Sequence, residues 1–126
     1  MQVAINGHDL EALVTSFASD VTSEQPAHPA RSFQGRDQVR TNWTMIFSMV
    51  PDLKATLLRS SVDDGVEWAE WAWDGTRADG EHFGLRGVTI HGLENDEIRW
   101  VHFYMEPLEQ AGGGVETAVK NAVGAK

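Results

Sequence analysis

The sequence predicts an α+β domain in which N-terminal helices pack on a curved antiparallel sheet. In roughly the first fifty residues, apolar side chains recur at helical spacing. Most of the later chain alternates apolar and polar side chains between short turn signals. An antiparallel sheet of this length must bury one face, and helices that precede it can cover that face. With 126 residues, 41% of them hydrophobic, one core forms without disulfides or metals.

The first helix is predicted from Asp9 to Phe17. Its apolar residues follow the spacing i, i+3, i+4, i+7, which is typical of an amphipathic helix; they are Leu10, Leu13, Val14 and Phe17. Asp9 stands at the N-cap position, where its carboxylate accepts a hydrogen bond from a free backbone N–H. Asn6-Gly7 separates this helix from a shorter helical turn between Val3 and Ile5.

The second helix is predicted from Arg36 to about Met49, and Pro51 with Asp52 ends it. Its apolar side chains share one face at helical spacing. They are Val39, Trp43, Ile46, Phe47 and Val50.

A short strand from Val21 to Gln25 is predicted between the two helices, because Pro26 and Pro29 stop it. The segment 27–34 is then a loop. Four longer strands follow the second helix, at 53–61, 66–74, 82–93 and 97–105. Turn signals separate them at Asp63-Asp64-Gly65, Ala78-Asp79-Gly80 and Asn95-Asp96. Consecutive strands joined by short loops predict an antiparallel meander.

The composition changes after Pro107, so we expect a domain over residues 1–108 and a glycine-rich tail over 109–126. Gly112-Gly113-Gly114 is a flexible break in this tail. The segment from Val115 to Val123 is expected to form at most a weak helix, because terminal segments of this kind are often loosely held.

Charge and composition exclude several classes of function. The net charge of −9 and the scattered Lys and Arg residues argue against nucleic-acid binding and against anionic membrane surfaces, which both require basic patches. The absence of cysteine excludes thiolate catalysis and disulfides. No apolar run approaches the ~20 residues of a membrane span, and the start of the sequence lacks a signal-peptide pattern. We therefore expect a cytoplasmic protein.

No metal or cofactor is expected. The histidines stand at positions 8, 28, 82, 91 and 102, without the local spacing of metal ligands. The sequence also has no glycine-rich phosphate loop and no nucleophile elbow.

Four stretches resemble the nuclear-transport-factor-2-like superfamily, and within it the SnoaL-like proteins. They are Asp9-Leu-Glu-Ala-Leu-Val, Gly35-Arg-Asp-Gln-Val, Gly75-Thr76 at the end of a Trp-rich strand, and Glu97-Ile-Arg-Trp-Val-His-Phe-Tyr-Met-Glu-Pro. The resemblance covers roughly residues 3–108. It implies a cone-shaped α+β barrel with a deep pocket and frequent dimers. The superfamily contains ketosteroid isomerases, limonene-1,2-epoxide hydrolases, polyketide cyclases and non-enzymatic binders, so the fold alone does not determine the function.

This sequence departs from the family pattern at the positions that carry those reactions. Gln25 stands where ketosteroid isomerases have their general base, and an amide cannot accept a proton from carbon at neutral pH. Thr89 aligns with their oxyanion-hole Asp, and their oxyanion-hole Tyr falls at or before Met1. Phe103 stands where epoxide hydrolases and polyketide cyclases place an Asp. The resemblance therefore implies the fold and the pocket but none of these activities.

The alternation of strand side chains predicts one face that lines a pocket. Its residues are mainly aromatic, with a few polar anchors, as in many small-molecule sites. The predicted pocket residues are Gln25, Trp43, Phe47, Trp71, Trp73, Thr89, His91, Val101, Phe103 and Met105. The alternative is that these side chains fill a solid core.

His91 is the predicted acid–base residue, because histidine titrates near neutral pH. No orienting partner for it is evident in the sequence, and a hydrogen-bonded structural histidine is the alternative. His28 and Arg31, in the loop flanked by prolines, are expected at the pocket mouth, where they would contact an anionic or carbonyl group or fix the loop itself.

The opposite faces of the same strands carry a second set of large side chains. This mixture is too apolar for a solvated surface and predicts a homodimer interface. The predicted dimer residues are Trp68, Glu70, Arg86, Val88, Ile90, Trp100, His102 and Tyr104. A register shift of one residue would exchange the two faces, and His102, Tyr104 and Glu70 would then form the catalytic set.

Three functions remain open at this point. The first is a non-catalytic binder of a small, mostly apolar molecule. The second is an enzyme of isomerase, cyclase or hydrolase type acting on such a molecule. The third is a dimeric scaffold with an incidental cavity. The missing carboxylates favour the first and third, and the aromatic pocket favours the first two.

Overall fold

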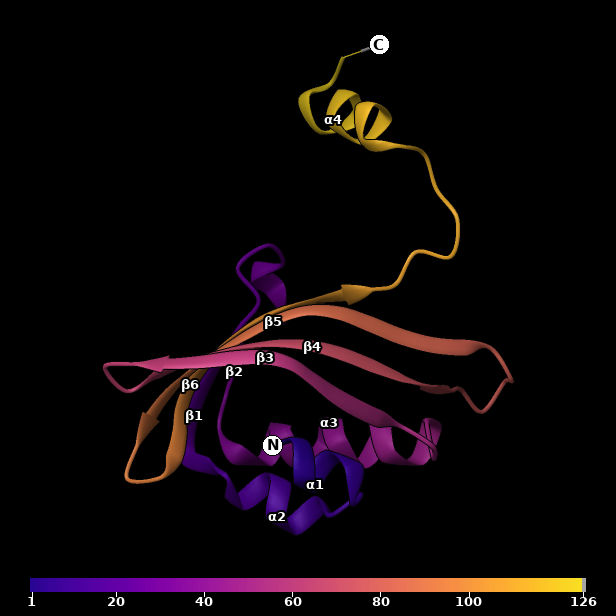
Figure 1. The fold of residues 1–126 in the computed structure, drawn as a ribbon. Helices are drawn as coiled ribbons and strands as arrows, with labels where there is room; N and C mark the ends of the chain where they lie inside the picture. Colours follow the sequence, from indigo (N-terminus) through magenta and orange to yellow (C-terminus); the bar gives the residue numbers. More distant parts are fainter. Residues whose placement is uncertain (126) are drawn as a thin grey trace.

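The computed structural model describes residues 1–125 and confirms the predicted α+β architecture, with three N-terminal helices together on one side of a curved sheet (Figure 1). Within these residues six strands form one sheet in the order β2-β1-β6-β5-β4-β3. The strands are β1 (Phe17–Glu24), β2 (Phe33–Gln34), β3 (Lys54–Asp63), β4 (Val66–Thr76), β5 (His82–Glu94) and β6 (Glu97–Pro107).

The helices on the sheet are α1 (Gln2–Asn6), α2 (Leu10–Thr15) and α3 (Arg36–Met49), and a 3-10 turn, η1 (Pro29–Arg31), lies between β1 and β2. Asp9 caps α2 as predicted, because its carboxylate accepts a hydrogen bond from the Ala12 backbone N–H at 3.1 Å. The helix ends earlier than predicted. The Ser16 carbonyl accepts a hydrogen bond from the Ile98 backbone N–H at 2.9 Å, so the chain joins the sheet and Phe17 begins β1 instead of ending a helix.

The strands β3, β4, β5 and β6 form the predicted antiparallel meander. β1 begins at Phe17 rather than Val21 and ends at Glu24 rather than Gln25. It lies beside β6 in the parallel direction, with Ser23 opposite Val101, a pairing that the sequence pattern did not assign. The first long strand of the chain therefore adjoins the last one, and this pairing brings the N-terminal segment into the sheet.

The helices and the concave face of the sheet enclose the core. α1 is also attached to the edge strand β3 through Asn6, whose Nδ2 donates to the Ala55 carbonyl at 2.9 Å while its Oδ1 accepts from the Ala55 N–H at 2.7 Å. The buried core consists of Ile5, Leu13, Val14, Phe17, Val21, Val39, Trp43, Val50, Leu53, Ala55, Ala69, Trp71, Trp73, Ile98, Val101 and Met105.

The tail contains the helix α4 (Val115–Val123), at the bounds expected for a weak helix. It is exposed along its length and stands apart from the sheet, on the side opposite α1, α2 and α3 (Figure 1). In the described part of the chain it therefore covers neither face of the sheet.

None of the helices within residues 1–125 is both long enough and apolar enough to cross a membrane.

Candidate ligand pocket

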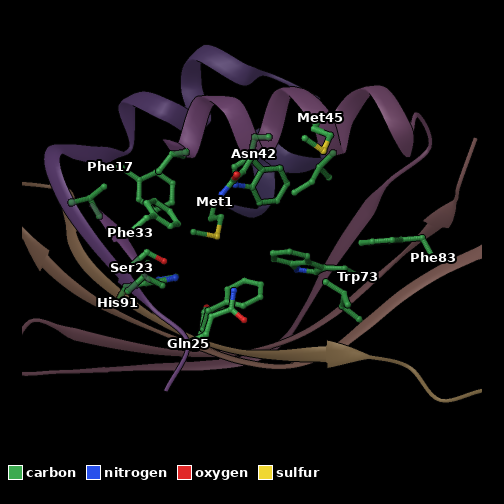
Figure 2. A pocket seen from close by; sticks show the side chains of 18 residues that line it. Met1, Phe17, Ser23, Gln25, Phe33, Asn42, Met45, Trp73, Phe83 and His91 are labelled. Carbon is green, nitrogen blue, oxygen red and sulfur yellow. The ribbon is translucent and has the colours of Figure 1, made fainter. Parts of the chain in front are cut away.

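A cavity of about 360 Å³ lies between α3 and the concave face of the sheet (Figure 2). This volume falls within the usual range of small-molecule sites. Side chains from β1, β2, α3, β4, β5 and β6 form its walls. They are Met1, Phe17, Val21, Ser23, Gln25, Phe33, Val39, Asn42, Trp43, Met45, Ile46, Trp73, Phe83, Leu85, Thr89, His91, Val101 and Phe103.

The structure brings most of the predicted pocket residues together around this cavity. Those in its walls are Gln25, Trp43, Trp73, Thr89, His91, Val101 and Phe103. The side chains that face the cavity therefore alternate along the strands as predicted. The alternative, a register shift of one residue that exchanges the two faces of the sheet, does not apply. His102 and Tyr104 lie on the opposite face, away from the cavity.

Three predicted pocket residues lie outside the cavity walls. Phe47 is turned along α3 toward His8, and the two rings stack with centroids 4.7 Å apart. Trp71 is 2% exposed and Met105 is 3% exposed, so both pack within the core. Trp71 still affects the cavity, because its Nε1–H donates a hydrogen bond to Oγ1 of Thr89 at 2.9 Å.

Several wall residues were absent from the sequence-based set. Val21 and Ser23 share the parity of Gln25, and Phe83 and Leu85 continue the inward parity of β5, so alternation would have identified these four. Phe33 follows a proline-containing loop, where no periodic pattern exists. The remaining additional wall residues are Met1, Phe17, Val39, Asn42, Met45 and Ile46.

His91 is a deeply buried polar residue of the wall. It is 1% exposed, as is Thr89, and Figure 2 shows His91 beside Ser23 at one end of the cavity. Its Nδ1 lies 3.2 Å from Oε1 of Glu67. Its Nε2 is buried and has no hydrogen-bond partner among the described residues.

Glu67 is the orienting partner that the sequence did not reveal. It lies directly opposite His91 in the register between β4 and β5, so the two side chains extend from the same face of the sheet. Its own side chain is about one-third exposed. Pairing the residues of β4 and β5 one by one, outward from the turn between them, would have identified Glu67.

Burial lowers the pKa of His91, because the charged imidazolium loses hydration. The Glu67 carboxylate acts in the opposite direction but does not outweigh burial. The ring is therefore neutral at pH 7. Since a carboxylate oxygen only accepts, Nδ1 carries the hydrogen and donates it to Glu67. Nε2 consequently carries a lone pair that has no partner in the described part of the chain.

Trp73 supplies a hydrogen-bond donor that complements the acceptor nitrogen of His91. Its Nε1–H is buried and lacks an acceptor within the described part of the chain. The ring lies in an aromatic cluster, with its centroid 5.5 Å from Trp43 and 5.8 Å from Phe103. In Figure 2 it lies across the cavity from His91. Two residues of the cavity wall therefore carry buried polar atoms without a partner in the described chain, a donor on Trp73 and an acceptor on His91.

Neither of the residues expected at the pocket mouth, His28 and Arg31, is part of the cavity walls. Nε2 of His28 is 2.8 Å from Oε1 of Glu106, so this ring fixes the loop against the end of β6. A guanidinium nitrogen of Arg31 donates to Oε1 of Gln25 at 3.0 Å. Arg31 thus orients a wall residue.

The outer face of the sheet carries the residues predicted for a dimer. Trp68 is 50% exposed and Tyr104 is 42% exposed. Glu70 and Arg86, two of the predicted dimer residues, each have a partner in their own chain. These partners are Arg59 for Glu70, at 2.8 Å, and Asp74 for Arg86, at 3.1 Å.

Other members of that face are partly covered by their neighbours. Ile90 is 9% exposed, whereas Val88 is half-buried. The indole of Trp100 lies against Gly92, which has no side chain to displace it. Nε2 of His102 is 3.5 Å from Oε2 of Glu24.

Within residues 1–125, no group of His, Asp and Glu side chains is arranged to hold a metal ion.

The sequence profile of the SnoaL-like domain matches residues 1–101, which is most of the chain. A comparison with curated protein sequences gives no match. The fold is similar to that of a hypothetical protein with a ketosteroid isomerase-like fold from Catenulispora acidiphila, crystallised with trimethylamine. The TM-score is 0.70 and the identity 21%, over 82% of this chain and 80% of that one.

Two further solved structures are similar at lower identity. One is IdmH, a proposed polyketide cyclase from Streptomyces antibioticus, with a TM-score of 0.71 and 18% identity over 83% of this chain and 86% of that one. The other is an LEH-like epoxide hydrolase from M. tuberculosis, with a TM-score of 0.71 and 11% identity over 83% and 76% of the two chains. At these identities the likeness concerns the fold.

Proposed function

We propose that this chain, which belongs to the SnoaL-like domain family, binds a small, uncharged, mostly apolar molecule in the cavity beneath α3. The observation that carries this proposal is a cavity of about 360 Å³ with aromatic walls and two buried, unpartnered polar atoms. A structurally similar protein was crystallised with the small molecule trimethylamine.

The two polar atoms argue for a ligand because an unpaired buried polar group costs free energy. Nε2 of His91 would accept a hydrogen bond from the ligand, and the Trp73 Nε1–H would donate one. None of the residues in the cavity walls is Asp, Glu, Lys or Arg, as far as the described chain extends. A ligand without a net charge therefore suits the walls, since a buried charge needs a counter-charge.

The family reactions named above are not part of this proposal. Gln25, Thr89 and Phe103 all lie in the cavity walls, at the positions where the resemblance places the acids and bases of those reactions. None of the three side chains titrates near neutral pH. A binding role is therefore favoured over isomerisation, epoxide hydrolysis or cyclisation by those residues.

Titration with N-phenyl-1-naphthylamine tests the proposal. This dye is uncharged and apolar, it carries one N–H, and its emission rises in apolar surroundings. We expect the wild-type protein to enhance its emission. Asn42→Phe, which places a ring in the cavity from α3, should weaken the affinity about tenfold or more, the equivalent of about 1.4 kcal/mol.

Thr44→Phe is the matched control, because Thr44 is an exposed residue of the same helix. It should leave the affinity unchanged. A dye that bound both variants equally well would be bound elsewhere, and an unresponsive wild-type protein would contradict the proposal directly.

We also propose that the outer face of the sheet forms a homodimer. The support is the exposure of Trp68 and Tyr104 on a face whose opposite side is already buried against the helices. Large exposed aromatic residues are enriched at such interfaces.

A further inference from the structure

We propose that His91 and Glu67 form a general-base pair, in which Nε2 of His91 removes a weakly acidic proton from an uncharged molecule held in the cavity. This inference rests on the proposed function, because the molecule must first bind. It adds a reaction and a second residue, Glu67, which lies outside the cavity walls and acts through His91.

The geometry has the three parts that a histidine base requires. His91 is a residue of the cavity wall, and its Nε2 is buried without a hydrogen-bond partner in the described residues. Nδ1 lies 3.2 Å from the Glu67 carboxylate, which fixes the tautomer and the orientation of the ring. The register pairing of Glu67 with His91 on adjacent strands places the partner on rigid backbone.

The surroundings keep the base in its reactive form. Two charged groups act on His91: the Glu67 carboxylate from β4, and the ammonium of the amino terminus, which slightly disfavours the imidazolium. On the other side, β6 and β1 present Val101 and Ser23, which are uncharged register partners in the same row. Burial then leaves the imidazole neutral at pH 7, with its Nε2 lone pair free to accept a proton.

Proton removal creates charges that the pair can accommodate. The bond between the acidic hydrogen and the ligand breaks, an Nε2–H bond forms, and the electron pair stays on the ligand. The resulting imidazolium is stabilised by the Glu67 carboxylate at Nδ1. Return of the proton to the ligand or to water restores the neutral ring, so the step requires no co-reactant.

The base can be tested with 5-nitrobenzisoxazole, a small, flat, uncharged carbon acid. When a base takes its ring C–H proton, the C–H electron pair completes a nitrile and the N–O bond breaks. The electron pair of that bond leaves on oxygen as a coloured phenolate. We expect the wild-type protein to catalyse this elimination, and His91→Gln to reduce kcat/KM about 100-fold or more, the usual contribution of a positioned base.

The variants His91→Gln and Glu67→Gln, together with one control, distinguish the role of the base from that of its partner. Glu67→Gln keeps a hydrogen-bond acceptor for Nδ1 but removes the negative charge. It should therefore lower kcat, leave KM nearly unchanged, and shift the acid limb of the pH–rate profile to lower pH. A Glu67 with a merely structural role would not move that limb. His82→Gln carries the same substitution on the same strand, outside the cavity walls, and should retain wild-type activity.

The nitrogen NMR spectrum of the wild-type histidine rings gives a test that depends on no variant. At neutral pH we expect His91 to be neutral, with hydrogen on Nδ1 and none on Nε2. A charged ring, or hydrogen on Nε2, would overturn the base.

Quenching of tryptophan fluorescence by 5-nitrobenzisoxazole separates the two proposals. If the wild-type protein binds this compound but converts it no faster than the His91→Gln variant does, the general-base pair is overturned and the binding function still stands. A wild-type protein that binds neither this compound nor the dye would overturn both.

Discussion

At the scale of single residues, His91 is subject to two opposing influences. Burial favours its neutral form, whereas the carboxylate of Glu67 favours the charged one, and burial prevails. The residue is therefore a base held away from water. A histidine whose role was only to fill the core would normally have both ring nitrogens hydrogen-bonded, and this one has a single bonded nitrogen within the described chain.

The lowered pKa of His91 makes the stability of the fold depend on pH. In the unfolded chain the ring protonates near its ordinary value of 6.5, whereas in the folded protein it stays neutral to lower pH. The unfolded state then binds more protons, so the free energy of unfolding falls as the pH drops below 6.5 and keeps falling until the folded pKa is reached. One proton contributes at most about 1.4 kcal/mol per pH unit.

Urea denaturation at about pH 7.5 and about pH 5.5, on either side of the ordinary histidine pKa, measures this effect. His91→Gln should reduce the loss of stability between the two conditions, whereas His82→Gln, at an exposed position, should retain it. An equal loss in both variants would show that other groups cause the pH dependence.

The candidate site was predictable from the sequence only in part, and the residues show why. Thr89, His91, Val101 and Phe103 were found because alternation along a strand is a local property. Glu67 was missed because its relation to His91 depends on how two strands are paired. Phe47 follows the same helical spacing as Trp43, but its ring stacks on His8, which lies between α1 and α2. Spacing along α3 cannot reveal this contact.

At the scale of elements, Gly87 determines how closely β5 and β6 approach each other. Its φ of +151° and the nearby backbone leave no room for a side chain. A Cβ there would lie 2.0 Å from the Tyr104 carbonyl oxygen and 2.9 Å from the Met105 Cα. These are main-chain atoms, which cannot rotate away. The close approach lies in the strands that carry Thr89 and Phe103 into the cavity.

Gly87→Ala should therefore destabilise the fold by about 2 kcal/mol or more, because it combines backbone strain with a main-chain clash. Gly84→Ala on the same strand is the control. A Cβ at Gly84 would mainly meet the ring of His82 at 2.8 Å, and this exposed side chain can move. Urea denaturation followed by circular dichroism measures both variants, and equal stability losses would contradict the proposed cause.

The elements themselves were predicted unevenly. α3 has the predicted bounds because its apolar spacing is uninterrupted and Pro51 follows it. The boundary between α2 and β1 was misplaced, since Phe17 continues the helical spacing of Leu10 and Leu13. Its place in a strand depends on Ile98, whose N–H binds the Ser16 carbonyl. A contact between such distant parts of the chain leaves no local signal.

At the scale of the whole molecule, the sheet has one face buried by helices and another that is partly apolar and exposed. The helix that could have covered the outer face, α4, stands apart from it (Figure 1). A stable interface between two copies would bury about 1,200 Å² or more in total, with Trp68 and Tyr104 near its centre.

Sedimentation equilibrium at micromolar concentration should therefore find a dimer. Tyr104→Asp should dissociate it, because a buried unpaired carboxylate is costly. Val119→Asp, on the exposed face of α4, should not. The reverse pattern would show that the tail holds the two copies together, and a monomeric wild-type protein would contradict the interface altogether.

The parallel pairing of β1 with β6 affects the order in which the sheet forms while the protein is synthesised on the ribosome. The hairpins β3–β4, β4–β5 and β5–β6 join neighbours in sequence, so each can close soon after its second strand emerges. β1 is made early but must wait for β6, the last of the six described strands. Pairings between such distant segments form slowly, since a long loop must close first. The sheet, and with it the part of the cavity wall that contains Ser23 and His91, is therefore completed only after β6 has been made.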